Sequence, residues 1–214
     1  MPEDLLGKAR VAKGFMPEDE GVLLHDVAVS ALRNGPGLEV GTYCGKSAIY
    51  LGAAARQAGS TVFTVDHHRG SEENQEGWEH HDPSLADREF GRLDTLPTFR
   101  HTIKEAGLEE EVVAVVGRST TVSALWRTPL ALLFVDGGHT DEHVTADYEG
   151  FGRWVASGAT LVFHDIYPDP ADGGQAPYRV FCRAVDGGDF AEVAARGSMR
   201  VLTRVHGDAG DPVR

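Results

Sequence analysis

Short runs of β-branched and other apolar residues alternate along this chain with segments in which apolar residues recur every three or four positions. The first pattern is typical of buried strands and the second of amphipathic helices. Strands are expected at 38–40, 61–66, 111–116, 130–135, 159–163, 190–194 and 199–204. Helices are expected at 17–32, 46–57, 96–106, 139–154 and 178–185. Three acids at the start of the first helix, Glu18, Asp19 and Glu20, are expected to interact favourably with its dipole.

This regular alternation predicts an α/β fold with a doubly wound, mostly parallel sheet. The run 130–135 is apolar throughout, which is typical of a strand buried on both faces. Residues 1–15 are polar and weakly periodic, so we expect a flexible arm or a lid there. Residues 205–214 are expected to form a disordered tail. We interpret the whole chain, 1–214, as a single domain.

Composition narrows the classes of partner. The 214 residues suffice for one well-packed α/β domain. A net charge of -13 argues against nucleic acids and anionic membranes, because phosphate groups are bound by clustered lysine and arginine. No run approaches the roughly 20 apolar residues of a membrane span, and the acidic start of the chain differs from a signal peptide. A cytoplasmic protein is expected, with Cys44 and Cys182 as reduced thiols.

The stretch 38–48, Leu-Glu-Val-Gly-Thr-Tyr-Cys-Gly-Lys-Ser-Ala, joins the first strand to a helix through two glycines. Gly41 and Gly45 allow positive φ and a close approach of a ligand to the backbone at the helix N-terminus. A P-loop needs a glycine five positions before Gly45, where Val40 stands. The dinucleotide pattern G-x-G-x-x-G is also absent, because Tyr43 stands where the second glycine of the pattern is required after Gly41. ATP and NAD are therefore disfavoured as ligands, and a tight turn without a ligand is the alternative.

Residues 39–48 have the pattern E-x-G-x-Y-C-G-x-S-A. This pattern resembles the S-adenosylmethionine (AdoMet) loop of class I methyltransferases, in particular that of catechol O-methyltransferase. The resemblance implies a seven-stranded sheet with a reversed strand in the C-terminal pair. It also implies that AdoMet lies against Glu39, Gly41, Tyr43, Gly45 and Ser47, and that His67, Arg118, Ser119 and Asp136 flank it, with Arg118 and Ser119 beside the adenine.

Asp66 ends the second predicted strand and should lie in the crevice beside the first turn. A carboxylate in this place can accept hydrogen bonds from both hydroxyls of a ribose. The alternative is a structural carboxylate that caps the loop.

A long polar insert, 67–94, follows Asp66 and contains four of the ten histidines. Its His-His pairs are not accompanied by cysteine and lack the spacing of a structural zinc site. Loops of this length are usually functional or disordered. We interpret the insert as a substrate-facing lid in which Trp78 offers a flat apolar face to the substrate; a solvated loop is the alternative.

Acids also follow the fourth and fifth predicted strands, at Asp136 and at His164-Asp165. Ligands of open α/β sheets collect at this carboxyl edge, so the two acids should converge there. Two facing carboxylates repel each other unless a cation lies between them, and hard oxygen ligands suit Mg²⁺ or Mn²⁺. We expect a metal site formed by Asp136 and Asp165. His164 is either a further ligand or a hydrogen-bonded core histidine.

The resemblance to catechol O-methyltransferase extends to this region, where that family has Asp-x-x-Lys and Asp-Asn. Here the chain has Asp136-x-x-His139 and His164-Asp165. With histidine in place of lysine, the chain resembles metal-dependent O-methyltransferases of bacterial sugars and glycosylated natural products. These include the actinobacterial 1-O-methyltransferases of methylmannose oligosaccharides. The resemblance implies His139 as the general base, because neutral imidazole accepts a proton near neutral pH. Trp78, His139 and Tyr167 are candidates for contacting the acceptor.

The sequence thus predicts AdoMet-dependent and divalent-metal-dependent methylation of a hydroxyl on a sugar or oligosaccharide. Catechol-like or glycosylated natural products are alternative acceptors, and an AdoMet-binding module without catalysis is an alternative function. A nucleoside-dependent sugar oxidoreductase is disfavoured because the turn lacks G-x-G-x-x-G. The acceptor and the oligomeric state stay open, with a homodimer among the allowed states.

Overall fold

The computed structural model describes residues 1–71, 74–75, 77–78, 81–87, 89 and 91–214, and within them seven strands form one sheet in the order β3-β2-β1-β4-β5-β7-β6. The strands are β1 (Gly37–Val40), β2 (Val62–Asp66), β3 (Val112–Val116), β4 (Leu130–Val135), β5 (Val155–Phe163), β6 (Phe190–Arg196) and β7 (Met199–Arg204). Strand β7 is antiparallel to both β5 and β6, whereas the pairs formed by β1 to β5 are parallel. The predicted α/β sheet with its reversed C-terminal strand is confirmed.

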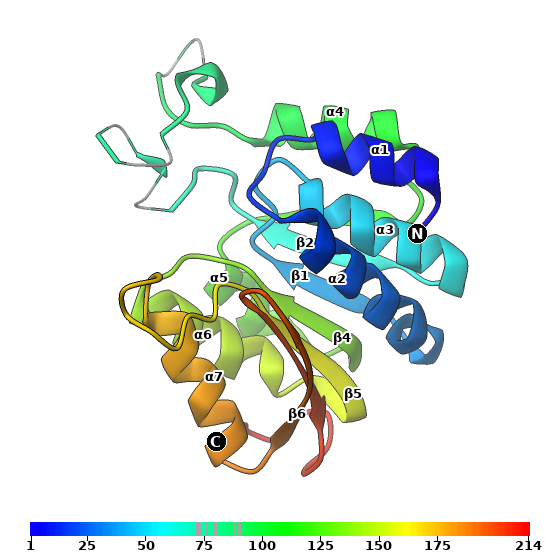
Figure 1. Ribbon diagram of the computed structural model, residues 1–214, viewed down its shortest axis with the longest axis vertical. Helices are drawn as coiled ribbons and strands as arrows, with labels where there is room; N and C mark the ends of the chain where they lie inside the picture. Colours follow the sequence, from blue (N-terminus) through cyan, green and yellow to red (C-terminus); the bar gives the residue numbers. More distant parts are fainter. Residues whose placement is uncertain (72–73, 76, 79–80, 88, 90) are drawn as a thin grey trace.

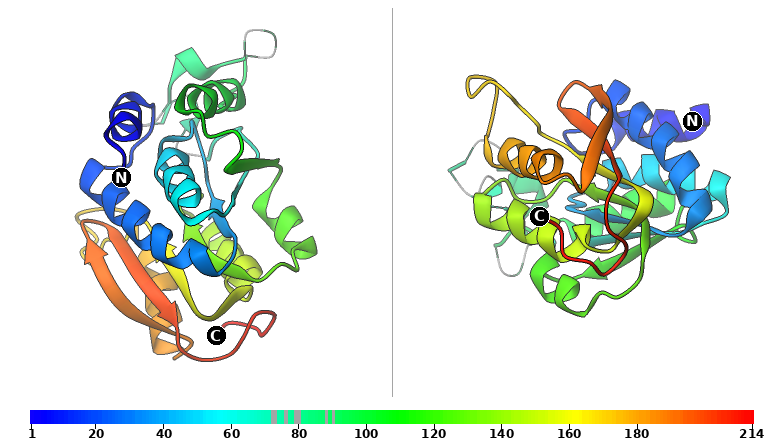
Figure 2. Two further views of the ribbon diagram at one scale, coloured as in Figure 1. Left: turned by 90° about the vertical axis from the view of Figure 1, so that its right-hand side faces the viewer. Right: turned by 90° about the horizontal axis from the view of Figure 1, so that it is seen from below.

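Helices cover both faces of the sheet (Figures 1 and 2). One layer contains α1 (Glu3–Val11), α2 (Glu18–Ala31), α3 (Lys46–Ala58) and α4 (Leu96–Ala106), and the other contains α5 (Ser119–Leu125), α6 (Asp141–Gly152) and α7 (Ala176–Asp186). Strand β4 separates two hydrophobic cores, because successive side chains of a strand point to opposite faces. Leu132 and Phe134 pack in the first core, and Leu133 and Val135 in the second. No helix in the described part of the chain is long and apolar enough to cross a membrane.

Most predicted elements are present, with shifted ends. Helices α3, α4 and α7 and strands β2, β3, β4 and β7 lie within two residues of their predicted bounds. Helix α6 begins at Asp141 instead of 139, because Thr140 caps it by accepting a hydrogen bond from the backbone N–H of His143. Helix α5 was missed because its seven residues all lie at least partly exposed, which leaves no apolar stripe to detect.

The prediction of a flexible arm at 1–15 is wrong. Residues Glu3–Val11 form helix α1, whose Leu5 and Ala9 are buried in the first core against α3. Glu3 and Asp4 lie in its first turn and Arg10 in its last, which suits the helix dipole. Two buried positions on one short helix make a weak periodic pattern, so the sequence did not reveal it.

The prediction of a disordered tail at 205–214 is also wrong. Val213 is buried in the second core, and the backbone N–H of Arg214 donates to Asp189 at 2.7 Å. The tail also folds over Arg153, whose guanidinium donates to the carbonyl of Gly210 at 2.7 Å. These contacts are made mostly by backbone atoms, which leave no trace in a hydrophobic pattern.

The strand order reverses at β1, which lies between β2 and β4. Ligands in open α/β sheets bind outside the carboxyl ends of the strands at such a point. The glycine turn follows β1 and Asp136 follows β4, so the fold brings the predicted cofactor loop and the predicted metal ligands to one edge.

Candidate active site

The turn between β1 and α3 has the backbone conformation that its sequence predicts. Gly41 and Gly45 have φ of 88° and 91°, and Tyr43 between them has φ of 49°. Gly45 is the N-cap of α3, so this helix starts directly at the crevice. A turn of this kind presents backbone N–H groups at a helix N-terminus.

Asp66, at the end of β2, fixes this turn. Its Oδ2 accepts hydrogen bonds from the backbone N–H groups of Thr42 at 3.0 Å and Tyr43 at 2.9 Å, and its Oδ1 accepts from His68 at 2.7 Å. The structure therefore shows the loop-capping role that sequence left as the alternative. Each carboxylate oxygen can accept a further bond, so the ribose role stays a prediction. His67 lies next to it, half-buried, with its Nδ1 accepting from the N–H of Arg69 at 3.0 Å.

Glu39 and Ser47 support the turn from beneath. Glu39 is fully buried, and its carboxylate accepts hydrogen bonds from the hydroxyls of Ser47 at 2.5 Å and Thr64 at 2.6 Å. Burial raises the pKa of Glu39 to about 7, although these two hydrogen bonds oppose the shift. The resemblance implies that Glu39 and Ser47 contact the cofactor. Direct contact does not agree with their burial, because Glu39 is fully buried and Ser47 is only 5% exposed.

Arg118 and Ser119 lie where α5 starts after β3, with Arg118 exposed as the N-cap. Ser119 hydrogen-bonds to Asp147 of α6, a residue that the sequence analysis missed. Asp147 is 3% exposed, its Oδ1 has no hydrogen-bond partner among the described residues, and burial raises its pKa to about 6. The available signal was an acid on the inward face of α6, beside Val144 and Tyr148.

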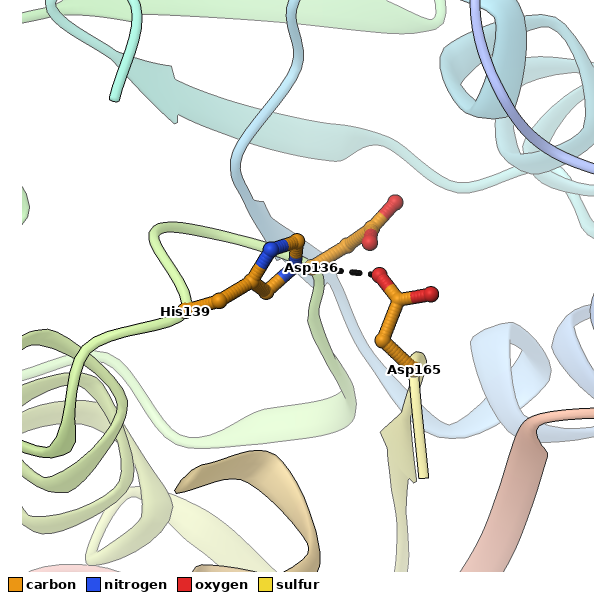
Figure 3. A group of neighbouring side chains, drawn as sticks. All are labelled: Asp136, His139 and Asp165. Atoms are coloured by element: carbon orange, nitrogen blue, oxygen red, sulfur yellow. Dashed lines mark ion pairs between the residues drawn. The ribbon is translucent and has the colours of Figure 1, made fainter. Parts of the chain in front are cut away.

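Asp136, His139 and Asp165 converge at the carboxyl edge of β4 and β5 (Figure 3). One ligand atom from each side chain lies within 4.8 Å of the others, and Nε2 of His139 is 3.0 Å from Oδ2 of Asp165. The three side chains are 20–30% exposed, so solvent reaches the cluster. Two carboxylates and an imidazole are a donor set that suits a small divalent cation, so the residues present fit the predicted metal.

The charges in this cluster are strongly coupled. Burial raises the pKa of Asp136, against the effect of the neighbouring His164. Burial also opposes ionisation of Asp165, but hydrogen bonds with His139 and His164 outweigh it and hold the pKa of Asp165 below its usual range. Tyr167 joins the cluster by donating a hydrogen bond from its hydroxyl to Oδ1 of Asp165 at 3.2 Å. This residue, a candidate for contacting the methyl acceptor, therefore lies beside the acids.

His164 is buried in contact with both acids of the cluster. Its side chain is 6% exposed, with Nε2 2.6 Å from Glu20 and Nδ1 3.1 Å from Asp136 and 3.2 Å from Asp165. Both ring nitrogens therefore face carboxylate oxygens, which agrees with the hydrogen-bonded core histidine that the sequence left as one alternative; a ligand role stays a prediction. Burial opposes its protonation, but the surrounding carboxylates outweigh it and hold the pKa of His164 well above its usual range.

The space beside the cluster is small. A cavity of about 10 Å³ lies next to Asp136, His139 and His164, which is near the minimum for a single water. This cavity is too small to hold an acceptor molecule. A wider groove of about 510 Å³ lies between α5 and α6, lined by Arg127 and Trp154, and does not include the cluster.

The insert 67–94 is anchored to the turn at its base. Leu85 and Leu93 pack with Cys44 in a small core beneath Tyr43, and Lys13 contacts Asp82. Trp78 is 59% exposed. Seven residues of the insert lie outside the described part of the chain (Figure 1), so a lid role stays a prediction.

A doubly wound sheet with a reversed seventh strand, a two-glycine turn after β1 and acids after β4 and β5 define a class I methyltransferase fold. Residues 38–166 match a family model described as a methyltransferase domain. The chain belongs to this family, and the prediction of a methyltransferase is confirmed.

Several solved structures share the fold. The O-methyltransferase NovP is 16% identical, with a TM-score of 0.69 and coverage of 96% of this chain and 89% of that one. The O-methyltransferase from Bacillus cereus in complex with SAH is 16% identical, with a TM-score of 0.63 over 95% and 90% of the two chains. TomG from Streptomyces achromogenes, an O-methyltransferase involved in tomaymycin synthesis and solved with SAM, is 18% identical, with a TM-score of 0.61 over 96% and 92%.

Proposed function

We propose that this methyltransferase uses AdoMet as the methyl donor and transfers the methyl group to a hydroxyl oxygen. The turn after β1 supports the cofactor, because its positive-φ glycines and the N-terminus of α3 lie at the sheet edge where such ligands bind. The structural neighbours from B. cereus and S. achromogenes, which hold SAH and SAM, support the same assignment. The observation that carries the proposal is the cluster of Asp136, His139 and Asp165 beside this turn.

A divalent cation, Mg²⁺ or Mn²⁺, completes the proposed site, held by Asp136 and Asp165. When bound, such an ion lowers the pKa of an acceptor hydroxyl. His139 is the proposed general base. Because the carboxylate of Asp165 accepts a hydrogen bond from Nε2–H, the acceptor nitrogen of the neutral ring is Nδ1, which is the atom that would take the proton. Asp165 thus fixes the tautomer and orientation of the base.

The proposed acceptor is a hydroxyl of a sugar or oligosaccharide, such as the 1-OH of a methylmannoside. The combination of Asp136-x-x-His139 with His164-Asp165 supports this class through its similarity to sugar O-methyltransferases. Tyr167 supplies a partly exposed ring beside Asp165, and Trp78 supplies an exposed ring on the insert. A catechol-like or glycosylated natural product is the second candidate, favoured by the likeness to TomG, which acts in tomaymycin synthesis.

Two measurements test the proposal. Mass spectrometry of the purified protein should detect co-purified S-adenosylhomocysteine, and calorimetry should show binding of AdoMet in preference to NAD and ATP. Methyl transfer from labelled AdoMet is then assayed on methylated mannosides, other oligosaccharides and catechols with Mg²⁺ present. Binding without transfer to any acceptor would favour the non-catalytic module, and preference for NAD would contradict the methyltransferase proposal.

A further inference from the structure

Glu20 is a buried acid that the proposed reaction does not use. It lies in the first turn of α2, is 4% exposed, and is 144 positions from His164 in the sequence. Nevertheless its Oε2 is 2.6 Å from Nε2 of His164. A carboxylate from a distant helix thus contacts the residue that faces both Asp136 and Asp165.

The hairpin between β6 and β7 closes around the same carboxylate. Oε1 of Glu20 accepts a hydrogen bond from the backbone N–H of Ser198 at 2.8 Å. Gly197 has φ of 52°, and a Cβ placed on it would lie 1.9 Å from Oε1 of Glu20. Only glycine is compatible with this approach, so α2, the end of β5 and the hairpin hold Glu20 in one position.

Glu20 and the two acids contact different nitrogens of the same ring. Nε2 of His164 faces Glu20, and Nδ1 faces Asp136 at 3.1 Å and Asp165 at 3.2 Å. The contact with Glu20 therefore fixes the orientation of the ring that Asp136 and Asp165 pack against.

We propose that Glu20 is a positioning residue for the metal site, which holds the ring of His164 so that Asp136 and Asp165 are oriented toward a divalent cation. The inference rests on the proposed divalent-metal site. Outer partners that orient metal ligands typically change metal affinity by 10- to 100-fold when they are removed.

The test is Mn²⁺ binding to the full chain, followed by electron paramagnetic resonance, with AdoMet affinity and circular dichroism as checks of the fold. Glu20→Gln keeps the shape of the side chain but replaces one acceptor oxygen with an amide NH₂ group, so its contacts with His164 and Ser198 cannot both be kept. The Kd for Mn²⁺ should therefore rise about 10- to 100-fold. Glu18→Gln is the matched control, because Glu18 lies on the same helix but pairs with Arg10 on the surface. The control should bind Mn²⁺ like the wild type.

A double variant covers the case in which Glu20→Gln does not fold. In Glu20→Gln with His164→Asn, the ring that Glu20 is proposed to position is absent. We expect this double variant to bind Mn²⁺ with the same Kd as His164→Asn alone, because Glu20 acts through that ring. A further loss of Mn²⁺ affinity in the double variant relative to His164→Asn, or wild-type affinity in a folded Glu20→Gln single variant, would overturn the inference. Absence of Mn²⁺ binding to the wild type would instead overturn the proposed metal site itself.

Discussion

A Cβ atom added to Gly41 would lie 2.1 Å from the backbone carbonyl oxygen of Asp136. The loop after β1 and the loop after β4 therefore touch through their backbones, with no room for a side chain between them. Gly41 belongs to the proposed cofactor turn, and Asp136 belongs to the acid cluster. This contact fixes the separation between the proposed cofactor turn and the acid cluster.

Substituting Gly41→Ala should disrupt both the fold near the turn and AdoMet binding. The φ of 88° is strained for alanine, by roughly 1–3 kcal/mol, and the clash with the Asp136 carbonyl adds to this cost. Thermal unfolding and calorimetry with AdoMet are the measurements. Gly59→Ala is the control, because Gly59 has φ of 68° but nothing within 4 Å of an added Cβ. Equal loss of stability in the two variants would contradict a role for the contact with Asp136.

The buried Glu39 should make stability depend on pH. Its pKa is raised from 4.5 to about 7, so the folded state favours the neutral acid. Its contribution is fully present below pH 4.5 and is lost as the pH rises through about 7. Relative to the wild type, Glu39→Gln should therefore gain stability between about pH 5 and pH 8, by up to about 3 kcal/mol. Unfolding curves across this range decide it, with Glu105→Gln on the exposed face of α4 as the control for one lost charge. Parallel pH profiles for wild type and Glu39→Gln would count against this assignment.

The two roles of Asp66 can be separated with a modified cofactor. Asp66→Ala removes the acceptor of three backbone N–H groups and, in the proposed site, of the ribose hydroxyls. AdoMet affinity should fall by about 1.5–3 kcal/mol, the scale for bonds to a charged acceptor. If Asp66 binds the ribose, a 2′,3′-dideoxy analogue of AdoMet should lose much less on the same substitution. Equal losses for both ligands in calorimetry would assign Asp66 to the turn alone.

Sequence was a reliable guide where the physical determinant is local. The glycines of the turn, the apolar run of β4 and the acids after β4 and β5 each carry their own signal. The cluster of Asp136, His139 and Asp165 could be predicted because parallel strands bring their carboxyl ends to one edge.

Determinants that are set by tertiary packing could not be predicted. The sequence predicts that Glu20 interacts with the dipole of its helix, but in the structure Glu20 is buried against His164 and Ser198. The roles of Glu39 and Asp147 likewise depend on their burial, which the sequence does not show. Helix α1 and the C-terminal tail were missed because few of their side chains enter the core.

The proposed roles of Asp165 as a metal ligand and of His139 as a general base can be tested separately. EDTA should abolish methyl transfer, and Mg²⁺ or Mn²⁺ should restore it, because an alcohol that is not activated is a poor nucleophile. Asp165→Asn should weaken Mn²⁺ binding as well as lower kcat, since it removes a charged ligand. His139→Ala should lower kcat by roughly 10²–10⁴-fold while Mn²⁺ and AdoMet affinities change little, as expected for a general base.

His139 lies within the cluster, so it could bind the metal instead of acting as a base, and the same pair of variants distinguishes the two roles. A ligand contributes to metal affinity before any chemistry occurs, whereas a base contributes only to turnover. If His139→Ala and Asp165→Asn raise the Kd for Mn²⁺ to a similar extent, His139 is a ligand and another group must take the proton. If only Asp165→Asn does so while both variants are slow, His139 is the base. Full activity after exhaustive dialysis against EDTA would exclude the metal, and the carboxylates of Asp136 and Asp165 would then have to act on the acceptor hydroxyl directly.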